Sequence, residues 1–172
     1  MRAVVYRETG SAADVLEVVD RPVPTPGPGE ARVRVVRAGV NPTDWKFRAN
    51  GMNGAWDEVV PGQDGAGVVE EVGPGVRDLA VGDRVVVPFN ISCGSCWTCS
   101  RGLHSQCETT QNRDTGTGAS LFGYSSLYGA VPGGQAELLR VPFADFLPMK
   151  VPHGPVDDRF VLLSDVLPTA WQ

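Results

Sequence analysis

Residues 93–107 read Cys93-Gly94-Ser95-Cys96-Trp97-Thr98-Cys99-Ser100-Arg101-Gly102-Leu103-His104-Ser105-Gln106-Cys107. This stretch holds all four cysteines of the chain, at the spacing Cys-x2-Cys-x2-Cys-x7-Cys. Two-residue spacers let the backbone curl around one ion, so that each sulfur lies about 2.3 Å from it. The spacing therefore predicts a tetrahedral zinc site with Cys93, Cys96, Cys99 and Cys107 as ligands. Four protein ligands leave no open coordination position, so this zinc is expected to be structural rather than catalytic.

A pair of disulfides is the competing interpretation of the same four cysteines. The chain opens Met1-Arg2-Ala3-Val4-Val5-Tyr6-Arg7-Glu8, which carries charges and lacks the apolar core of a signal peptide. We therefore expect a cytoplasmic protein, and thiols in the cytosol are kept reduced. This expectation favours one zinc ion per chain over disulfides.

The composition is that of a soluble globular protein with room for one ordinary domain. Of 172 residues, 42% are hydrophobic and 20% are charged. No apolar run approaches the 18 or so residues that a membrane helix needs, so no membrane partner is expected. The formal net charge of −5, with scattered basic residues, argues against nucleic-acid binding.

The hydrophobic pattern predicts a mostly β fold with many turns. The 21 glycines and 14 prolines, about a fifth of the chain, separate short apolar stretches. Strands are expected over residues 3–6, 15–19, 30–40, 84–88 and 134–141, and a glycine-rich strand follows the turn at 61–64. In the third of these, valines alternate with Arg32 and Arg34, which indicates one buried and one solvated face. A helix is expected to start at Asn41, because a capping side chain is followed there by a proline. Residues 156–163 could form another helix.

Motifs from one end of the chain to the other resemble the GroES-like N-terminal domain of the medium-chain dehydrogenase/reductase superfamily. They are Pro61-Gly62-Gln63-Asp64-x2-Gly67-x-Val69-x2-Val72-Gly73, Gly82-Asp83-Arg84-Val85, the four-cysteine stretch, Gly133-Gly134-Gln135-Ala136-Glu137 and Leu163-Ser164-Asp165-x-Leu167-Pro168-Thr169. The resemblance implies a partly open β-barrel over residues 1–172, with few short helices. A structural zinc lobe is expected within it, over residues 89–117.

The same resemblance implies where an active site would lie. Zinc alcohol dehydrogenases carry cysteine and histidine ligands for a catalytic zinc where this chain has Asn41 and Gln63. Amides are weak zinc ligands, and Gly39-Val40-Asn41-Pro42-Thr43-Asp44 is instead similar to the zinc-free quinone oxidoreductases. Asp165 stands where formaldehyde-dehydrogenase-like members have a catalytic zinc ligand. The expected catalytic residues are therefore Asn41, Asp44, Gln63, Asp64 and Asp165, with no catalytic zinc, although Gln63, Asp64 and Asp165 could hold a metal weakly.

A nucleotide-binding domain is not expected within this sequence. The Gly-x-Gly-x-x-Gly turn between a strand and a helix is missing; Gly65-x-Gly67 precedes a strand, and Gly116-x-Gly118 lies in a loop. NAD(P) is thus expected only if a Rossmann domain is supplied elsewhere. Two functions stay open. One is the substrate-side domain of an oxidoreductase for a small carbonyl or alcohol, as a homodimer or with a partner nucleotide-binding domain. The other is a stand-alone, zinc-stapled binding or scaffold domain.

Overall fold

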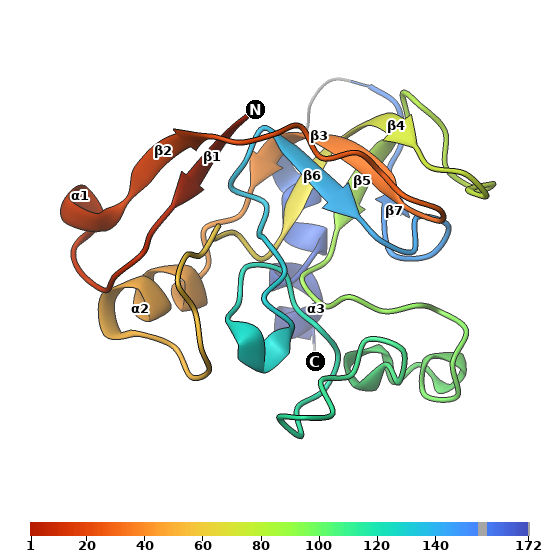
Figure 1. The fold of residues 1–172 in the computed structure, drawn as a ribbon. Helices are drawn as coiled ribbons and strands as arrows, with labels where there is room; N and C mark the ends of the chain where they lie inside the picture. Colours follow the sequence, from red (N-terminus) through yellow and green to blue (C-terminus); the bar gives the residue numbers. More distant parts are fainter. Residues whose placement is uncertain (155–157, 172) are drawn as a thin grey trace.

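The main sheet of the protein has five antiparallel strands (Figure 1). The computed structural model describes residues 1–154 and 158–171. In spatial order the strands are β6 (Leu138–Val141), β3 (Ala31–Ala38), β4 (Gly65–Val72), β5 (Arg84–Val87) and β7 (Met149–Lys150). Every neighbouring pair is antiparallel, as expected for a fold built from hairpins and returning connections.

The alternation predicted for the third strand is confirmed by burial. Val33 of β3 is 1% exposed and packs into the main hydrophobic core. Arg32 and Arg34 point to the other face, where they pair with Glu70 and Glu71 of β4. The period of two along the strand thus decides which residues build the core and which stay solvated.

A second, two-stranded sheet pairs β1 (Arg2–Val5) with β2 (Glu17–Asp20). A single helical turn, α1 (Ala12–Val15), occupies the start of the segment expected to be a strand from residue 15 onward. Ala3 bridges to Ala136 just before β6, so the first sheet continues toward the second without closing on it. The mostly β, partly open architecture predicted from the sequence is therefore confirmed.

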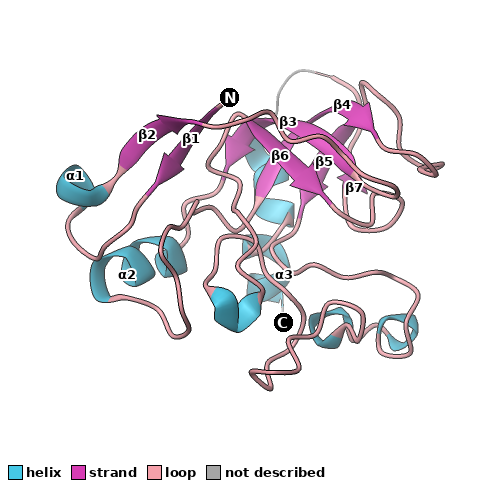
Figure 2. Ribbon diagram, in the orientation of Figure 1, coloured by secondary structure: helices cyan, strands magenta, loops and turns pink. Residues whose placement is uncertain are grey.

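The helices are short and irregular structure fills much of the remainder (Figure 2). Helix α2 (Pro42–Asn50) starts at Asn41 as predicted. A 3-10 segment, η4 (Asp158–Leu163), precedes helix α3 (Val166–Trp171). The helix expected over 156–163 is thus a 3-10 helix where it is described, and residues 156 and 157 lie outside the described residues. Among the described residues, no helix combines the length and hydropathy needed to cross a bilayer.

The cysteine stretch forms a lobe at the edge of the molecule, below the five-stranded sheet in Figure 1. It contains two short 3-10 turns, η1 (Cys99–Arg101) and η2 (His104–Gln106), and η3 (Ser126–Tyr128) follows later in the chain. The lobe contacts the body through the rings of His104 and Phe146, whose centroids are 5.2 Å apart. The lobe therefore has little regular secondary structure.

Candidate functional site

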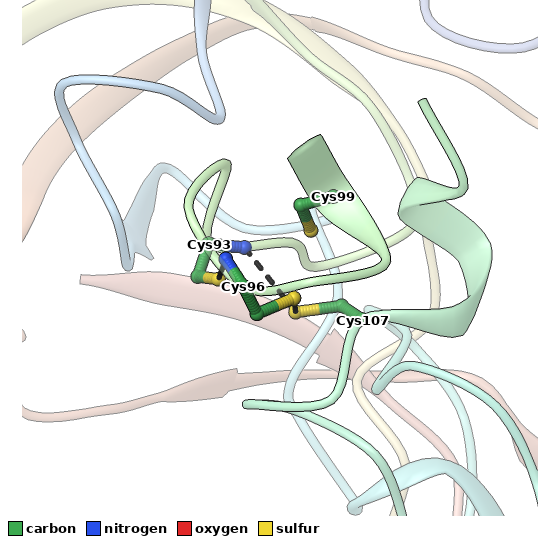
Figure 3. A group of neighbouring side chains, drawn as sticks. All are labelled: Cys93, Cys96, Cys99 and Cys107. Atoms are coloured by element: carbon green, nitrogen blue, oxygen red, sulfur yellow. Dashed lines mark hydrogen bonds between the residues drawn. The ribbon is translucent and has the colours of Figure 1, made fainter. Parts of the chain in front are cut away.

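The four cysteines converge within the lobe (Figure 3). Their sulfur atoms all lie within 4.8 Å of one another, and all four thiols are free. The sulfurs of Cys96 and Cys107 are 3.9 Å apart, whereas a disulfide needs about 2.05 Å. A tetrahedron with arms of about 2.3 Å has corners about 3.8 Å apart. The spacing of these sulfurs therefore fits a tetrahedral zinc ion and not a disulfide.

Backbone N–H groups and one hydroxyl of the lobe donate hydrogen bonds to these sulfurs, which stabilises negative charge on them. The Cys93 sulfur accepts hydrogen bonds from the backbone N–H of Cys96 (3.4 Å) and the hydroxyl of Thr109 (3.2 Å). The Cys107 sulfur accepts from the N–H of Cys93, also at 3.4 Å. Gly94 makes the turn with φ +78°, and a Cβ there would lie 2.3 Å from the ring of Phe146. Only glycine fits this position, because both the dihedral angle and the neighbouring ring exclude a side chain.

The thiol pKa values differ widely across the cluster. The Thr98 hydroxyl, 3.2 Å from the sulfur, lowers the pKa of Cys96 to about 5. Burial raises the pKa of Cys93, but hydrogen bonds from Thr109 and the backbone outweigh it and bring the pKa to about 7. Burial raises the pKa of Cys99 to about 12. Zinc binds thiolates, so its binding to this cluster displaces the remaining thiol protons.

A second cluster lies where α2 starts, opposite the turn that leads into β4. It consists of five polar side chains, each at most 8% exposed: Asn41, Asp44, Gln63, Asp64 and Ser164. The first four are residues that the sequence analysis selected, and they come from two segments about 20 positions apart. Ser164 joins them from the turn between η4 and α3.

Asp44 ties helix α2 to the turn before β4. One of its carboxylate oxygens accepts from the backbone N–H of Asn41 (2.8 Å), and the other accepts from that of Gly62 (3.0 Å). Burial raises the pKa of Asp44, the two backbone hydrogen bonds partly offset this rise, and the nearby Asp64 adds to it. With both oxygens bonded to backbone, Asp44 positions the cluster; the catalytic role predicted for it stays a prediction.

Asp64 is held by side chains from two distant parts of the chain. Its Oδ2 accepts from the Ser164 hydroxyl at 2.7 Å, and its Oδ1 accepts from the Asn41 Nδ2 at 3.2 Å. A Cβ at Gly39 would lie 2.0 Å from the same Oδ1, so glycine leaves the space that this carboxylate fills. Asp64 is therefore a buried carboxylate that accepts a hydrogen bond on each oxygen. One of these bonds uses an N–H of the Asn41 side-chain amide.

Gln63 keeps an unused donor. Its Oε1 accepts a hydrogen bond from the Thr43 hydroxyl at 2.6 Å, which fixes the orientation of the amide. The buried Nε2 makes no hydrogen bond of acceptable geometry with any described residue. The phenol of Tyr124 is near enough to interact with Gln63 and Thr43, although burial dominates and raises the pKa of Tyr124. A buried donor without a partner costs about 1–3 kcal/mol, so this amide is positioned to receive a ligand atom.

Asp165 does not share the buried contacts of its neighbour Ser164. It is half-buried, and its Oδ1 accepts from the Thr169 hydroxyl at 3.1 Å, within the first turns of α3. Across residues 1–154 and 158–171, the four cysteines are the one group of three or more cysteine, histidine or acidic ligands close enough to share a metal. The metal site considered for Gln63, Asp64 and Asp165 thus has no third acidic, cysteine or histidine ligand beside it.

Sequence reasoning missed three contributors to this cluster. Thr43 and Ser164 lie inside the quoted motifs, between residues that were selected, so the motifs carried a signal for both. Tyr124 had none, because it lies outside the quoted motifs. Its ring packs edge-on against Phe47 of α2, with centroids 5.3 Å apart, and this contact brings it to Gln63.

Comparisons with known proteins agree with the cysteine lobe and the sheet arrangement. Residues 27–152 match the model of the alcohol dehydrogenase GroES-like domain. The chain is 36% identical to the zinc-type alcohol dehydrogenase-like protein AdhB of Bacillus subtilis, over 99% of this chain and 44% of that protein. It is 35% identical to a glutathione-independent formaldehyde dehydrogenase of Pseudomonas aeruginosa, over 99% of this chain and 43% of the relative.

Among solved structures, the alcohol dehydrogenase TADH from Thermus sp. ATN1 superimposes with a TM-score of 0.84 at 34% identity. The match covers 99% of this chain and 46% of that protein. The chain thus spans less than half the length of the relatives named here. The match of residues 27–152 to the family model, together with the mostly β, partly open fold and the converging cysteines, shows that this chain belongs to the alcohol dehydrogenase GroES-like domain family.

Proposed function

We propose that this chain is the substrate-side domain of an NAD(P)-dependent oxidoreductase for a small carbonyl or alcohol, with a structural zinc and no catalytic zinc. Relatives named as alcohol and formaldehyde dehydrogenases support the substrate class. The Nε2 of Gln63 carries the proposal, because it is a fixed, buried donor that makes no hydrogen bond of acceptable geometry with any described residue, within the family's expected active-site positions. We also propose a cytoplasmic location, where thiols are kept reduced and so can bind zinc.

The structural zinc belongs to Cys93, Cys96, Cys99 and Cys107, whose sulfur spacing fits it. It would order a lobe, which we take as residues 89–117, that has little regular structure of its own. The ion supplies no open position for a substrate, since four sulfurs complete its coordination. Its part in the function is to hold the lobe against the body.

The donor set of the polar cluster argues against a second, catalytic zinc. Two of the three positions where zinc-dependent relatives are expected to have ligands hold the amides of Asn41 and Gln63. Zinc favours thiolate and imidazole over amide oxygen. The two carboxylates of the cluster, Asp44 and Asp64, already accept hydrogen bonds on both oxygens. Gln63 would therefore act on a carbonyl group where a metal acts in the zinc-dependent relatives.

We expect the described residues to hold no NAD(P) of their own. Gly65 and Gly67, one of the two glycine pairs, lie inside β4 and pair with β5 and β3, so they cannot cradle a phosphate. Bound by other residues, the nicotinamide supplies or accepts a hydride. This chain would place the carbonyl oxygen on the Gln63 Nε2, and that hydrogen bond strengthens as negative charge develops on the oxygen. Losing one such donor typically costs about 2.7–4 kcal/mol of barrier.

A carbonyl that cannot react tests the site without a turnover assay. N,N-dimethylacetamide offers a carbonyl oxygen and no N–H, and we expect it to shift the side-chain amide signals of Gln63 in a 15N NMR titration. The side-chain amide of Gln111, which is exposed and distant in sequence, serves as the internal control. Gln63→Leu should weaken the probe's binding, whereas Gln111→Leu should not.

The same pair of variants in the whole protein should differ in NAD(P)H oxidation with aldehydes or quinones by about a hundredfold or more. If the probe leaves the Gln63 signals unmoved, or shifts those of Gln111 equally, the proposal fails. The zinc-stapled binding or scaffold domain then becomes the better description.

A further inference from the structure

A cavity of about 480 Å³ lies outside the polar cluster, between the N-terminal end of β1, the proline-rich connector after β2, and β6. None of the five residues of the polar cluster lines it. Its volume falls within the range of about 300–1,000 Å³ that is usual for small-molecule sites. The cavity is therefore large enough for a ligand and is separate from the site proposed above.

The wall of the cavity is mainly apolar. It includes Val60, Ile91, Val131, Leu138 and Phe143, which come from five separate segments of the chain. Ile91 is 3% exposed and belongs to the main core, so this part of the wall is firmly packed. A wall of this composition favours an apolar ligand body.

Four of the five charged groups at the cavity form two ion pairs within the protein. The guanidinium of Arg21 pairs with Glu58, and that of Arg140 lies 3.5 Å from Glu30. The N-terminal ammonium of Met1 donates to the carbonyl oxygen of Arg21 at 2.8 Å.

The hydroxyls that line the cavity are also satisfied. Those of Thr110 and Ser120 donate to backbone carbonyl oxygens at 2.6 and 2.9 Å. With the arginines, glutamates and hydroxyls of the wall bonded within the protein, an uncharged ligand would leave these interactions in place.

One residue of the wall is held in a strained conformation. Phe143 has φ +51°, which is uncommon for a bulky residue and carries a cost of order 1–3 kcal/mol. Two hydrogen bonds hold the turn: Ala144 N–H to the Gly29 carbonyl (2.9 Å) and Leu147 N–H to the Phe143 carbonyl (2.8 Å). Glycine would make this turn without strain. The aromatic ring, which packs partly on the core and partly lines the cavity, is what the strained turn provides.

We propose that this cavity is a binding site for an uncharged, mainly apolar small molecule. Volume, apolar lining, internally paired charges and the strained Phe143 all point to the same class of ligand. The site does not depend on the proposed oxidoreductase function, because its wall shares no residue with the polar cluster.

A matched pair of probes tests the ligand class. N-phenyl-1-naphthylamine is uncharged, and 8-anilinonaphthalene-1-sulfonate has the same anilinonaphthalene skeleton with one negative charge. In fluorescence titrations of the full chain loaded with zinc, the uncharged probe should saturate near one per chain and bind at least tenfold more tightly than the sulfonate. Absence of saturable binding, or equal or tighter binding of the sulfonate, would overturn the proposal.

The three methionines report where the probe binds. Met1 lines the cavity, whereas Met52 and Met149 do not. With 13C-methyl-labelled methionine, the uncharged probe should move the Met1 signal and leave the other two in place. Shifts at Met52 or Met149 as large as that of Met1, or no shift at Met1, would contradict the assignment.

Filling the cavity supplies an independent check. Leu138→Trp places a larger side chain in the cavity and should weaken binding of the uncharged probe at least tenfold. Leu103→Trp makes the same change on an exposed part of the lobe and should leave binding unchanged. Equal affinity in the two variants would contradict the proposal. The methionine signals give the location even if Leu138→Trp fails to fold.

Discussion

Replacing Asn41 with serine tests whether its amide does more than cap helix α2. Serine caps a helix about as well as asparagine, so the cap itself should cost little. The shorter side chain cannot replace the 3.2 Å hydrogen bond from Asn41 Nδ2 to Asp64. Asp64 is 3% exposed and would keep one side-chain donor, Ser164. A hydrogen bond to a charged group contributes about 1.5–3 kcal/mol, and that is the expected loss in the free energy of unfolding.

Urea and thermal denaturation of the zinc-loaded chain, monitored by circular dichroism, measure this loss. For a chain of this length each kcal/mol corresponds to about 2–4 °C in melting temperature, so Tm should fall by about 3–12 °C. Asn50→Ser is the matched control, because Asn50 is an exposed residue of the same helix whose amide donates only to the Lys46 carbonyl. We expect the control to change stability by no more than about 0.5 kcal/mol.

A double-mutant cycle with Asp64→Asn identifies the partner. If the lost interaction is the one with the Asp64 carboxylate, the two substitutions should be non-additive by at least about 0.5 kcal/mol. A loss in Asn41→Ser no larger than in Asn50→Ser, or additive effects in the cycle, would refute the inference that Asn41 holds Asp64. Asn41 would then be a helix cap alone.

Two further outcomes follow from the lobe and from Tyr6, a core residue that is 2% exposed. Protein purified without added metal should contain about one zinc per chain by elemental analysis. Cys107→Ser should lower that zinc content sharply, whereas Ser100→Ala should not. A firmly bound second zinc equivalent would contradict a single site. Burial raises the pKa of Tyr6 to about 12, so the unfolded chain releases this proton first and stability should fall as pH rises from about 10 toward 12. Urea midpoints at pH 8.5 and 10.5 should decline less in Tyr6→Phe than in the parent chain, and an equal decline would exclude Tyr6 as the cause.

Local patterns were sufficient for much of the fold. The alternation of valines with Arg32 and Arg34 predicted a strand with one buried face, because side chains alternate along any strand whatever it packs against. Asn41 followed by a proline predicted the start of α2 for a similarly local reason. The strand expected from residue 15 was the weaker prediction, since a helical turn at Ala12–Val15 takes its first position.

By itself, the sequence determined the cysteine cluster and four members of the polar cluster. Two-residue spacers force sulfurs together, and the quoted motifs mark Asn41, Asp44, Gln63 and Asp64. Only the tertiary structure decided what these side chains do. It brought Ser164 to Asp64 from 100 positions away and directed the Asn41 amide to the same carboxylate. It also left the Gln63 Nε2 without a hydrogen bond of acceptable geometry to any described residue. These contacts and the apolar cavity beside β6 both depend on how distant segments pack. The spacing of residues along the chain therefore predicts neither the contacts nor the cavity.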